Sequence, residues 1–241
     1  MTAIREMFYF IPLCLCAFAP RFSGSTIKQL NNVLGVKKMP LNIRAVIFDL
    51  GRVLIKVDFT RGLFRYRNPS GDKSDQEVLE ELFADPVFVD FNTGRITPQE
   101  TFRLIKTKYN LPIDYPVFVA EWSNIFAPME GMEKLLTDVA GKFPVGLLSD
   151  IDPLHWAYCQ KHYPFLQVFK KPALSFEIGA LKPAEICYKT AARNVSTAPE
   201  NCLFIDDRQI NVDGAIHAGM QSIRFTDAGS LYRDLEIRGI L

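Results

Sequence analysis

From residue 144 onward, short apolar runs alternate along the chain with segments of helical periodicity. The apolar runs have the length of buried strands. The expected strands are residues 144–149, 167–170, 202–206 and 221–225. The expected helices are residues 153–162, 183–195 and 212–218. Strands that alternate with helices predict a parallel, doubly wound α/β sheet, as in Rossmann-like folds.

An earlier apolar run, residues 44–51, reads Arg-Ala-Val-Ile-Phe-Asp-Leu-Gly. A continuous apolar run predicts a strand that is buried on both faces, and this one delivers a single carboxylate, Asp49, to its end. In an open α/β sheet, ligands bind at the carboxyl ends of the strands. Gly51 follows two residues later and permits a tight turn or a close approach to a metal or an anion.

The stretch between this strand and residue 144 is helical in character. Expected helices cover residues 75–85, 98–109, 115–125 and 132–139, and the second begins with Thr97 as N-cap and Pro98 at the first helical position. We interpret the insertion as a separate helical cap. The expected division is residues 1–40 as an N-terminal extension or targeting segment, 41–56 and 130–241 as the α/β core, and 57–129 as the cap.

Two adjacent carboxylates, Asp206 and Asp207, end the expected strand at 202–206. They repel each other unless a cation lies between them or one of them takes up a proton. Magnesium prefers oxygen ligands and is usually held by one or two carboxylates together with phosphate oxygens and water. An aspartate pair after a strand is often only a turn, but Asn211 and Gly214 downstream make the pattern more specific.

Ser149 and Asp150 lie at the end of another expected strand, and Lys182 precedes Pro183 in a loop. The lysine offers a point charge for a phosphate, and the serine offers a hydroxyl group. Each residue alone is ordinary. Their order along the chain, together with Asp49, favours metal-assisted phosphoryl transfer to a carboxylate.

These motifs resemble those of the haloacid dehalogenase superfamily of phosphatases from residue 44 to residue 241. The matching stretches are Ile47 to Leu54, Leu147 to Asp150, Lys182 with Pro183, and Phe204 to Gly214. The inserted helices resemble the superfamily's type-1 cap. An Asp-Leu-Gly first motif is similar to that of bacterial α-D-glucose-1-phosphate phosphatases and of the phosphatase domain of soluble epoxide hydrolase.

The resemblance implies a role for each matching residue. Asp49 would attack phosphorus, and Lys182 would assist it. Ser149, Asp150 and Lys182 would contact the phosphoryl group. Mg²⁺ would be held by Asp49, the carbonyl group of Gly51 and Asp207, with Asp206 close by.

Two positions depart from the superfamily pattern. Gly51 stands where the usual general acid is an aspartate, and a magnesium-bound water, Asp58 or Asp206 could take over that role. Asp150 stands where relatives commonly have asparagine, which adds negative charge beside the expected phosphate site. Basic side chains that could offset this charge are Arg52, Lys56 and Arg208.

Three functions remain open at this point. The first is a magnesium-dependent phosphatase for a small phosphorylated metabolite, such as glucose 1-phosphate or another sugar phosphate. The second is a 2-haloacid dehalogenase, although attack on carbon does not require the acidic pair. The third is a non-catalytic protein that binds phosphate, because Gly51 removes the usual general acid.

Composition restricts the classes of partner that we expect, but it does not decide between these three functions. The 241 residues are 48% apolar with a net charge of +1 and no long basic run, which argues against a nucleic-acid partner. The five cysteines are scattered, and the histidines His155, His162 and His217 share no metal-binding spacing. We expect a cytoplasmic protein without stable membrane association. Residues 1–19 also resemble a secretory signal, a short membrane anchor is a further possibility, and translation from Met39 would place residues 1–38 outside the fold.

Overall fold

The computed structural model describes residues 42–58, 61–63, 77, 81 and 84–241. The expected N-terminal segment at 1–40 and most of the expected helix at 75–85 lie outside these residues. No described helix combines the length and the apolar character that crossing a membrane requires.

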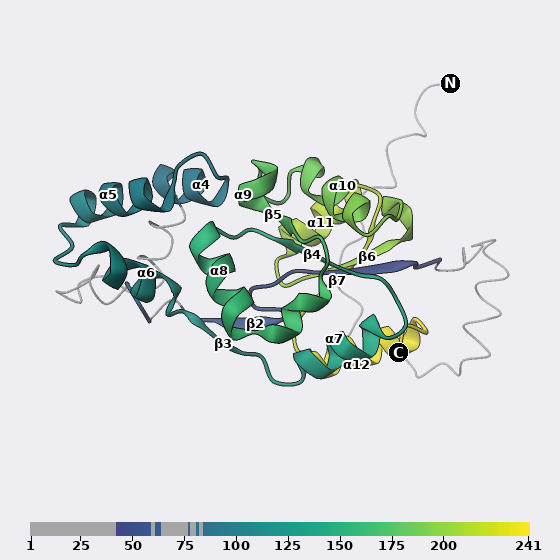
Figure 1. The fold of residues 1–241 in the computed structure, drawn as a ribbon. Helices are drawn as coiled ribbons and strands as arrows, with labels where there is room; N and C mark the ends of the chain where they lie inside the picture. Colours follow the sequence, from purple (N-terminus) through teal and green to yellow (C-terminus); the bar gives the residue numbers. More distant parts are fainter. Residues whose placement is uncertain (1–41, 59–60, 64–76, 78–80, 82–83) are drawn as a thin grey trace, which may run out of the picture. The chain divides into compact units, whose positions relative to one another are not determined.

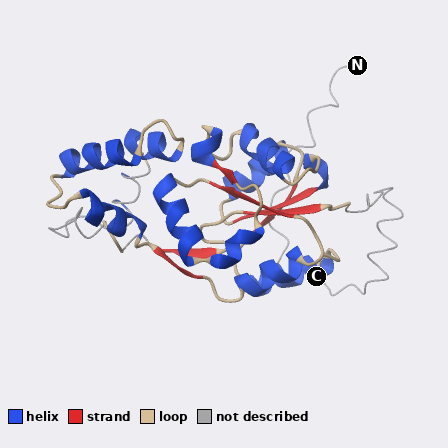
Figure 2. Cartoon of the chain, in the orientation of Figure 1, coloured by secondary structure: helices blue, strands red, loops and turns tan. Residues whose placement is uncertain are grey.

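A five-stranded parallel sheet forms the centre of the described fold, in the order β5-β4-β1-β6-β7 (Figures 1 and 2). The expected parallel α/β fold is therefore confirmed. The middle strand β1 is buried at every position, as its continuous apolar sequence predicts. The strands are β1 (Ala45–Phe48), β4 (Val145–Ser149), β5 (Ala173–Leu174), β6 (Cys202–Asp206) and β7 (Gln221–Arg224).

Alternate residues of β1 pack on opposite faces of the sheet. Val46 and Phe48 join an apolar cluster with the helices α7 (Met132–Ala140), α8 (Pro153–His162) and α12 (Ala228–Ile237). Ala45 and Ile47 join a second cluster with the helices α10 (Glu185–Asn194) and α11 (Gln209–His217). Figure 1 shows α10 and α11 on one side of the sheet, and α7 and α12 on the other. The sheet is thus covered on both faces, as in doubly wound folds.

Three further helices lie between residues 86 and 123 of the described chain. They are α4 (Pro86–Asn92), α5 (Pro98–Tyr109) and α6 (Tyr115–Ser123), and we call them the helical insert. They share an apolar cluster of their own that includes Phe91, Phe118 and Trp122. The predicted cap of α5 is confirmed, because the Thr97 side chain accepts from the Glu100 N–H at 3.2 Å.

Two short antiparallel strands, β2 (Ile55–Val57) and β3 (Phe126–Pro128), lie where the chain enters and leaves the insert. Paired strands bring the two ends of an insertion together. They lie near the expected boundaries at residues 56 and 130. The division itself into core and cap stays a prediction.

Three expected elements were wrong in position, and two short helices were not expected. The strand expected at 167–170 is wrong, because a 3₁₀ helix, η1 (Pro164–Val168), covers its first two residues. The strand in this part of the chain is β5, at residues 173–174, where its place is set by pairing with Leu148 and Ser149. Helix α10 begins at Glu185, two residues after Pro183, and α11 begins at Gln209, three residues before its expected start. Helix α4 and the one-turn helix α9 (Ser175–Ile178) had not been expected.

Candidate functional site

Neighbouring strands bring the candidate residues to one edge of the sheet. Because β4, β1 and β6 are parallel neighbours, their carboxyl ends meet, and Ser149, Asp49 and Asp206 lie at those ends. Lys182 comes from the loop between α9 and α10. The structure therefore brings together residues that lie far apart in the sequence.

The ammonium group of Lys182 joins two of the carboxylates. Its Nζ donates to Asp49 Oδ1 at 2.7 Å and to Asp206 Oδ2 at 2.8 Å, and it also donates to the Leu148 carbonyl oxygen at 3.3 Å. The Lys182 side chain is only 2% exposed. The lysine lies in a loop, as expected from the sequence, but it is buried rather than open to solvent.

Asp206 is held in place by donors on its other side. Its Oδ1 accepts from the backbone N–H of Arg208 at 2.9 Å, and Asn211 Nδ2 lies 3.0 Å from both of its carboxylate oxygens. Asn211 lies five residues downstream, in the first turn of α11. Its position in the sequence pattern was noted, but its hydrogen bonds to Asp206 could not be predicted. Among the described residues, the buried Oδ1 of Asn211 has no hydrogen-bond partner.

Asp150 supports the lysine through the backbone. Its Oδ1 accepts from the N–H of Lys182 at 3.0 Å. Burial raises the pKa of the Asp150 carboxyl group, while the charges of Lys182 and Arg208 act to lower it. Of the three basic residues considered for this role, Arg208 acts on Asp150 in this way. Arg52 instead forms an ion pair with Asp207 at 3.7 Å.

The crowding of carboxylates changes how Asp49 titrates. Burial is the main cause that raises the pKa of Asp49, to about 7, and the charges of Asp206 and Asp207 add to it while Lys182 opposes it. Burial also raises the pKa of Asp207, again with Asp206 adding to the effect. Burial alone would lower the pKa of Lys182, but the surrounding carboxylates raise it, so this group stays charged. The single positive charge of Lys182 therefore does not neutralise the negative charge of the carboxylates around it.

The acidic groups fit a divalent cation. Asp49, Asp206 and Asp207 each offer a carboxylate oxygen, and these atoms lie within 4.8 Å of one another. Hard oxygen donors at this spacing suit Mg²⁺, which would also relieve the repulsion that raises the pKa of Asp49. Gly51, two residues after Asp49, forms a bridge with Ile55 at the turn after β1.

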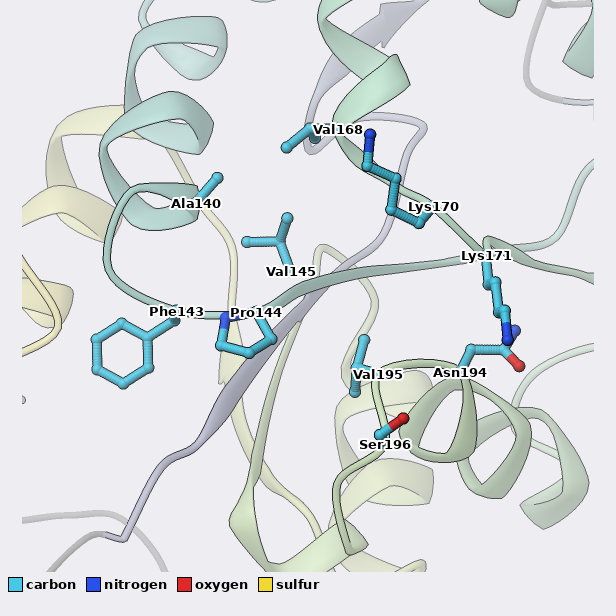
Figure 3. Close-up of a pocket in the computed structure, with 10 residues that line it drawn as sticks. All are labelled: Ala140, Phe143, Pro144, Val145, Val168, Lys170, Lys171, Asn194, Val195 and Ser196. Carbon is cyan, nitrogen blue, oxygen red and sulfur yellow. The ribbon is translucent and has the colours of Figure 1, made fainter.

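A hollow of about 320 Å³ lies elsewhere on the core (Figure 3). It is lined by Pro144 and Val145 at the start of β4, by Lys170 and Lys171, and by residues at the end of α10. Ser149 lies at the opposite end of β4. The hollow contains none of the candidate site residues, so it is not the site described above.

Comparisons with known proteins agree with this fold. No family model matches the chain. The flavin mononucleotide hydrolase 1 of Arabidopsis thaliana is 28% identical over 85% of this chain and 79% of its own length. The sesquiterpene phosphatase astK of Aspergillus oryzae is 25% identical over 84% of this chain and 99% of its own length. The drimenol cyclase drtB of Aspergillus calidoustus is 22% identical over 80% of this chain. The matching part covers only 36% of the length of that protein.

The solved structures that are similar to this chain include a haloacid dehalogenase family enzyme, bt-2542, from Bacteroides thetaiotaomicron in complex with magnesium and inorganic phosphate. It is 26% identical, with a TM-score of 0.67, over 77% of this chain and 95% of its own. The chain is similar in sequence and in fold to this haloacid dehalogenase family enzyme. Two of the relatives above are named as a hydrolase and as a phosphatase.

Relative to the superfamily pattern, the chain lacks a carboxyl group at position 51, where it has Gly51. The residues that the resemblance had assigned to nucleophile, lysine and acidic pair nevertheless come together, as Asp49, Lys182, Asp206 and Asp207. The roles of these residues remain a proposal.

Proposed function

We propose that this chain is a magnesium-dependent phosphatase that hydrolyses a small organic phosphate monoester, such as a sugar phosphate, through an aspartyl phosphate at Asp49. The observation that carries this proposal is the position of Lys182, whose Nζ contacts both Asp49 and Asp206. A buried ammonium group beside a carboxylate nucleophile can neutralise a phosphoryl group in the same place.

In the first step, a carboxylate oxygen of Asp49 forms a bond to phosphorus, and the bond from phosphorus to the alcohol oxygen breaks. Lys182 and the hydroxyl group of Ser149 bind the phosphoryl oxygens. Because Gly51 carries no acid, the departing oxygen takes its proton from water. Asp206 is a poor donor for this proton, since both of its oxygens already accept hydrogen bonds.

In the second step, water attacks the same phosphorus, and the bond between phosphorus and Asp49 breaks. Phosphate leaves, and the Asp49 carboxylate is restored. Asp49, Asp206, Asp207 and the carbonyl group of Gly51 would hold Mg²⁺. When bound, the ion would neutralise the charge that develops on the phosphoryl oxygens.

The carboxylate pair is the reason to prefer this reaction over dehalogenation. Displacement of a halide from carbon by Asp49 requires no divalent cation, whereas transfer of a dianionic phosphoryl group to a carboxylate does benefit from one. Asp206 and Asp207 therefore have a use in phosphate hydrolysis that they lack in the alternative.

Phosphate release from an aryl phosphate tests this proposal, followed by a panel of sugar phosphates. We expect release that requires Mg²⁺, stops with chelator, and falls by at least about 1,000-fold in Asp49→Asn, because the nucleophile is lost. Asp138→Asn, at a surface carboxylate paired with Lys134, is the matched control and should retain full activity. Phosphate binding without release, at any Mg²⁺ concentration, would show a non-catalytic protein instead.

A further inference from the structure

A buried cluster next to the candidate site joins the helical insert to the core. It consists of Asp152, which caps α8, His155 in the first turn of α8, and Trp122 near the end of α6. Asp152 is fully buried, while His155 and Trp122 are 8% and 7% exposed. The reaction proposed above does not use any of these side chains.

The carboxylate of Asp152 is satisfied by four donors. Its Oδ1 accepts from the N–H groups of Leu154 and His155 at 2.9 and 3.0 Å. Its Oδ2 accepts from Trp122 Nε1 at 2.9 Å and lies 2.6 Å from His155 Nδ1. These contacts occupy both carboxylate oxygens and fix the orientation of the Asp152 side chain.

The second ring nitrogen of His155 also faces an acceptor. Its Nε2 lies 2.8 Å from the carbonyl oxygen of Trp122, near the last turn of α6, where carbonyl groups lack partners within the helix. A neutral imidazole has a proton on only one nitrogen. Either neutral tautomer would therefore place a lone pair against an oxygen, at Nδ1 or at Nε2, and only the imidazolium satisfies both contacts.

The aromatic surroundings suit a cation on the ring. The His155 ring stacks on Trp122 with centroids 5.4 Å apart, and Phe126 meets it edge-on at 5.0 Å. Positive charge is favourable over an indole face and near the C-terminus of α6, while the position of His155 in the first turn of α8 opposes it and the Asp152 carboxylate offsets that effect. Among the described residues, Asp152 is the charged group that contacts the ring. Cys159 also faces Asp152, but burial and that carboxylate raise the pKa of its thiol, so it stays neutral.

We propose that His155 is a positioning residue, which as an imidazolium fastens α6 of the helical insert to the loop that follows β4. This loop begins at Asp150, directly after Ser149 at the end of β4, so the proposal rests on the phosphatase function given above. The loop is held on its other side by reciprocal hydrogen bonds between Ile151 and Ser175, at 2.9 and 3.1 Å. Loss of the His155 proton breaks one of the two bonds at the ring and loosens the insert from the loop.

Nuclear magnetic resonance of the full chain labelled with ¹⁵N-histidine tests the protonation directly, since the chain has three histidines. We expect both ring nitrogens of His155 to carry protons at pH 7, and the Trp122 indole proton to be protected from solvent exchange. His155→Gln should speed that exchange at least about tenfold. His162→Gln, on the exposed side of the same helix, should leave it unchanged. A neutral His155 ring in the unmodified chain would overturn the proposal, even if the variant does not fold.

Kinetics separate this proposal from the function on which it rests. His155→Gln should lower kcat/KM by roughly tenfold, since a small displacement of the groups that bind the phosphoryl group lowers the rate. If kcat/KM of the wild-type chain falls when His155 loses its proton, this fall should be absent from the pH profile of the variant. Unchanged kcat/KM and an unchanged pH profile would contradict the positioning role. An inactive wild-type chain with a doubly protonated His155 ring would count against the phosphatase function alone.

Discussion

Asp49 and Asp85 are buried to nearly the same extent, with 7% and 5% of their surface exposed. Their surroundings differ, because hydrogen-bond donors surround Asp85, whereas further carboxylates lie beside Asp49. Asp85 caps α4 and accepts from Val87 N–H, Lys108 Nζ and Tyr109 Oη at 3.0, 2.7 and 3.0 Å. Asp49 accepts from Lys182 but has Asp206 and Asp207 beside it.

The two carboxyl groups consequently titrate in opposite directions. Burial alone would raise the pKa of Asp85, but the hydrogen bonds from Lys108, Val87 and Tyr109 lower it. Burial and neighbouring carboxylates raise the pKa of Asp49 to about 7. A buried carboxylate with enough donors stabilises its fold, whereas one crowded by other acids costs stability and is typical of functional sites. This contrast separates the structural cluster around Asp85 from the candidate catalytic cluster around Asp49.

Removal of the lysine from each cluster should have different consequences. Lys182→Ala should lower kcat/KM roughly 100- to 1,000-fold, since it removes charge from the phosphoryl site. It should also destabilise the metal-free chain by about 3 kcal/mol, because two buried carboxylates lose their partner. Lys108→Ala should leave kcat/KM within about twofold of the wild-type value and cost less than about 1 kcal/mol, since Lys108 is half exposed.

Steady-state kinetics and urea unfolding measure both variants. Equal loss of activity in the two variants would remove the distinction between the clusters. A stable but inactive Lys182→Ala would show that Lys182 acts in catalysis without balancing the buried charge.

Addition of Mg²⁺ should stabilise the chain through the Asp49 cluster only. At 100 times the dissociation constant, the expected gain in free energy of unfolding is about 2.7 kcal/mol. Asp207→Asn should abolish the gain, whereas Asp85→Asn should retain it. Thermal unfolding with and without chelator measures the effect, and a gain that persists in Asp207→Asn would place the ion elsewhere.

The dependence of stability on pH should have opposite signs at the two aspartates in the absence of metal. The folded-state pKa of Asp49, about 7, lies above its ordinary value of 3.8, so ionised Asp49 costs stability as the pH rises between these values. Asp49→Asn should therefore become more stable relative to wild type over that range.

The folded-state pKa of Asp85 lies below its ordinary value, so its contribution is present above that ordinary value and is lost as the pH falls through the folded-state pKa. Asp85→Asn should be less stable than wild type at pH 7, by about 1 kcal/mol, and the difference should shrink in acid. Urea unfolding of both variants from pH 3 to 8 measures the two slopes. Parallel slopes would show that the clusters do not differ in charge balance.

Much of the fold could be predicted, because the start of a helix and the end of a strand depend on residues that are adjacent in the sequence. Helix α8 and strand β6 have the bounds expected from the sequence, since Asp152 with Pro153 marks the start of the helix and Asp206 ends an apolar run. Strand β5 could not be placed in this way, because it has only two residues and is positioned by pairing with β4.

Contacts between distant residues explain what the sequence did not reveal about the site. Lys182 reaches Asp49 across 133 positions, and its burial depends on carboxylates supplied by three strands. The contact of His155 with Trp122 could not be predicted, because Trp122 lies 33 positions away in the helical insert. The kind of chemistry could be predicted from strand-end residues, but the balance of charge around each of them required the structure.

Chemical trapping of the aspartyl phosphate tests the central claim most directly. The full chain is mixed with an aryl phosphate and Mg²⁺, quenched with borohydride, which reduces an acyl phosphate to an alcohol, and digested with trypsin. The peptide of residues 45–52 should then contain homoserine in place of Asp49, and only when substrate and Mg²⁺ are both present. Release of phosphate by the chain while Asp49 remains an unmodified aspartate in that peptide would contradict the account.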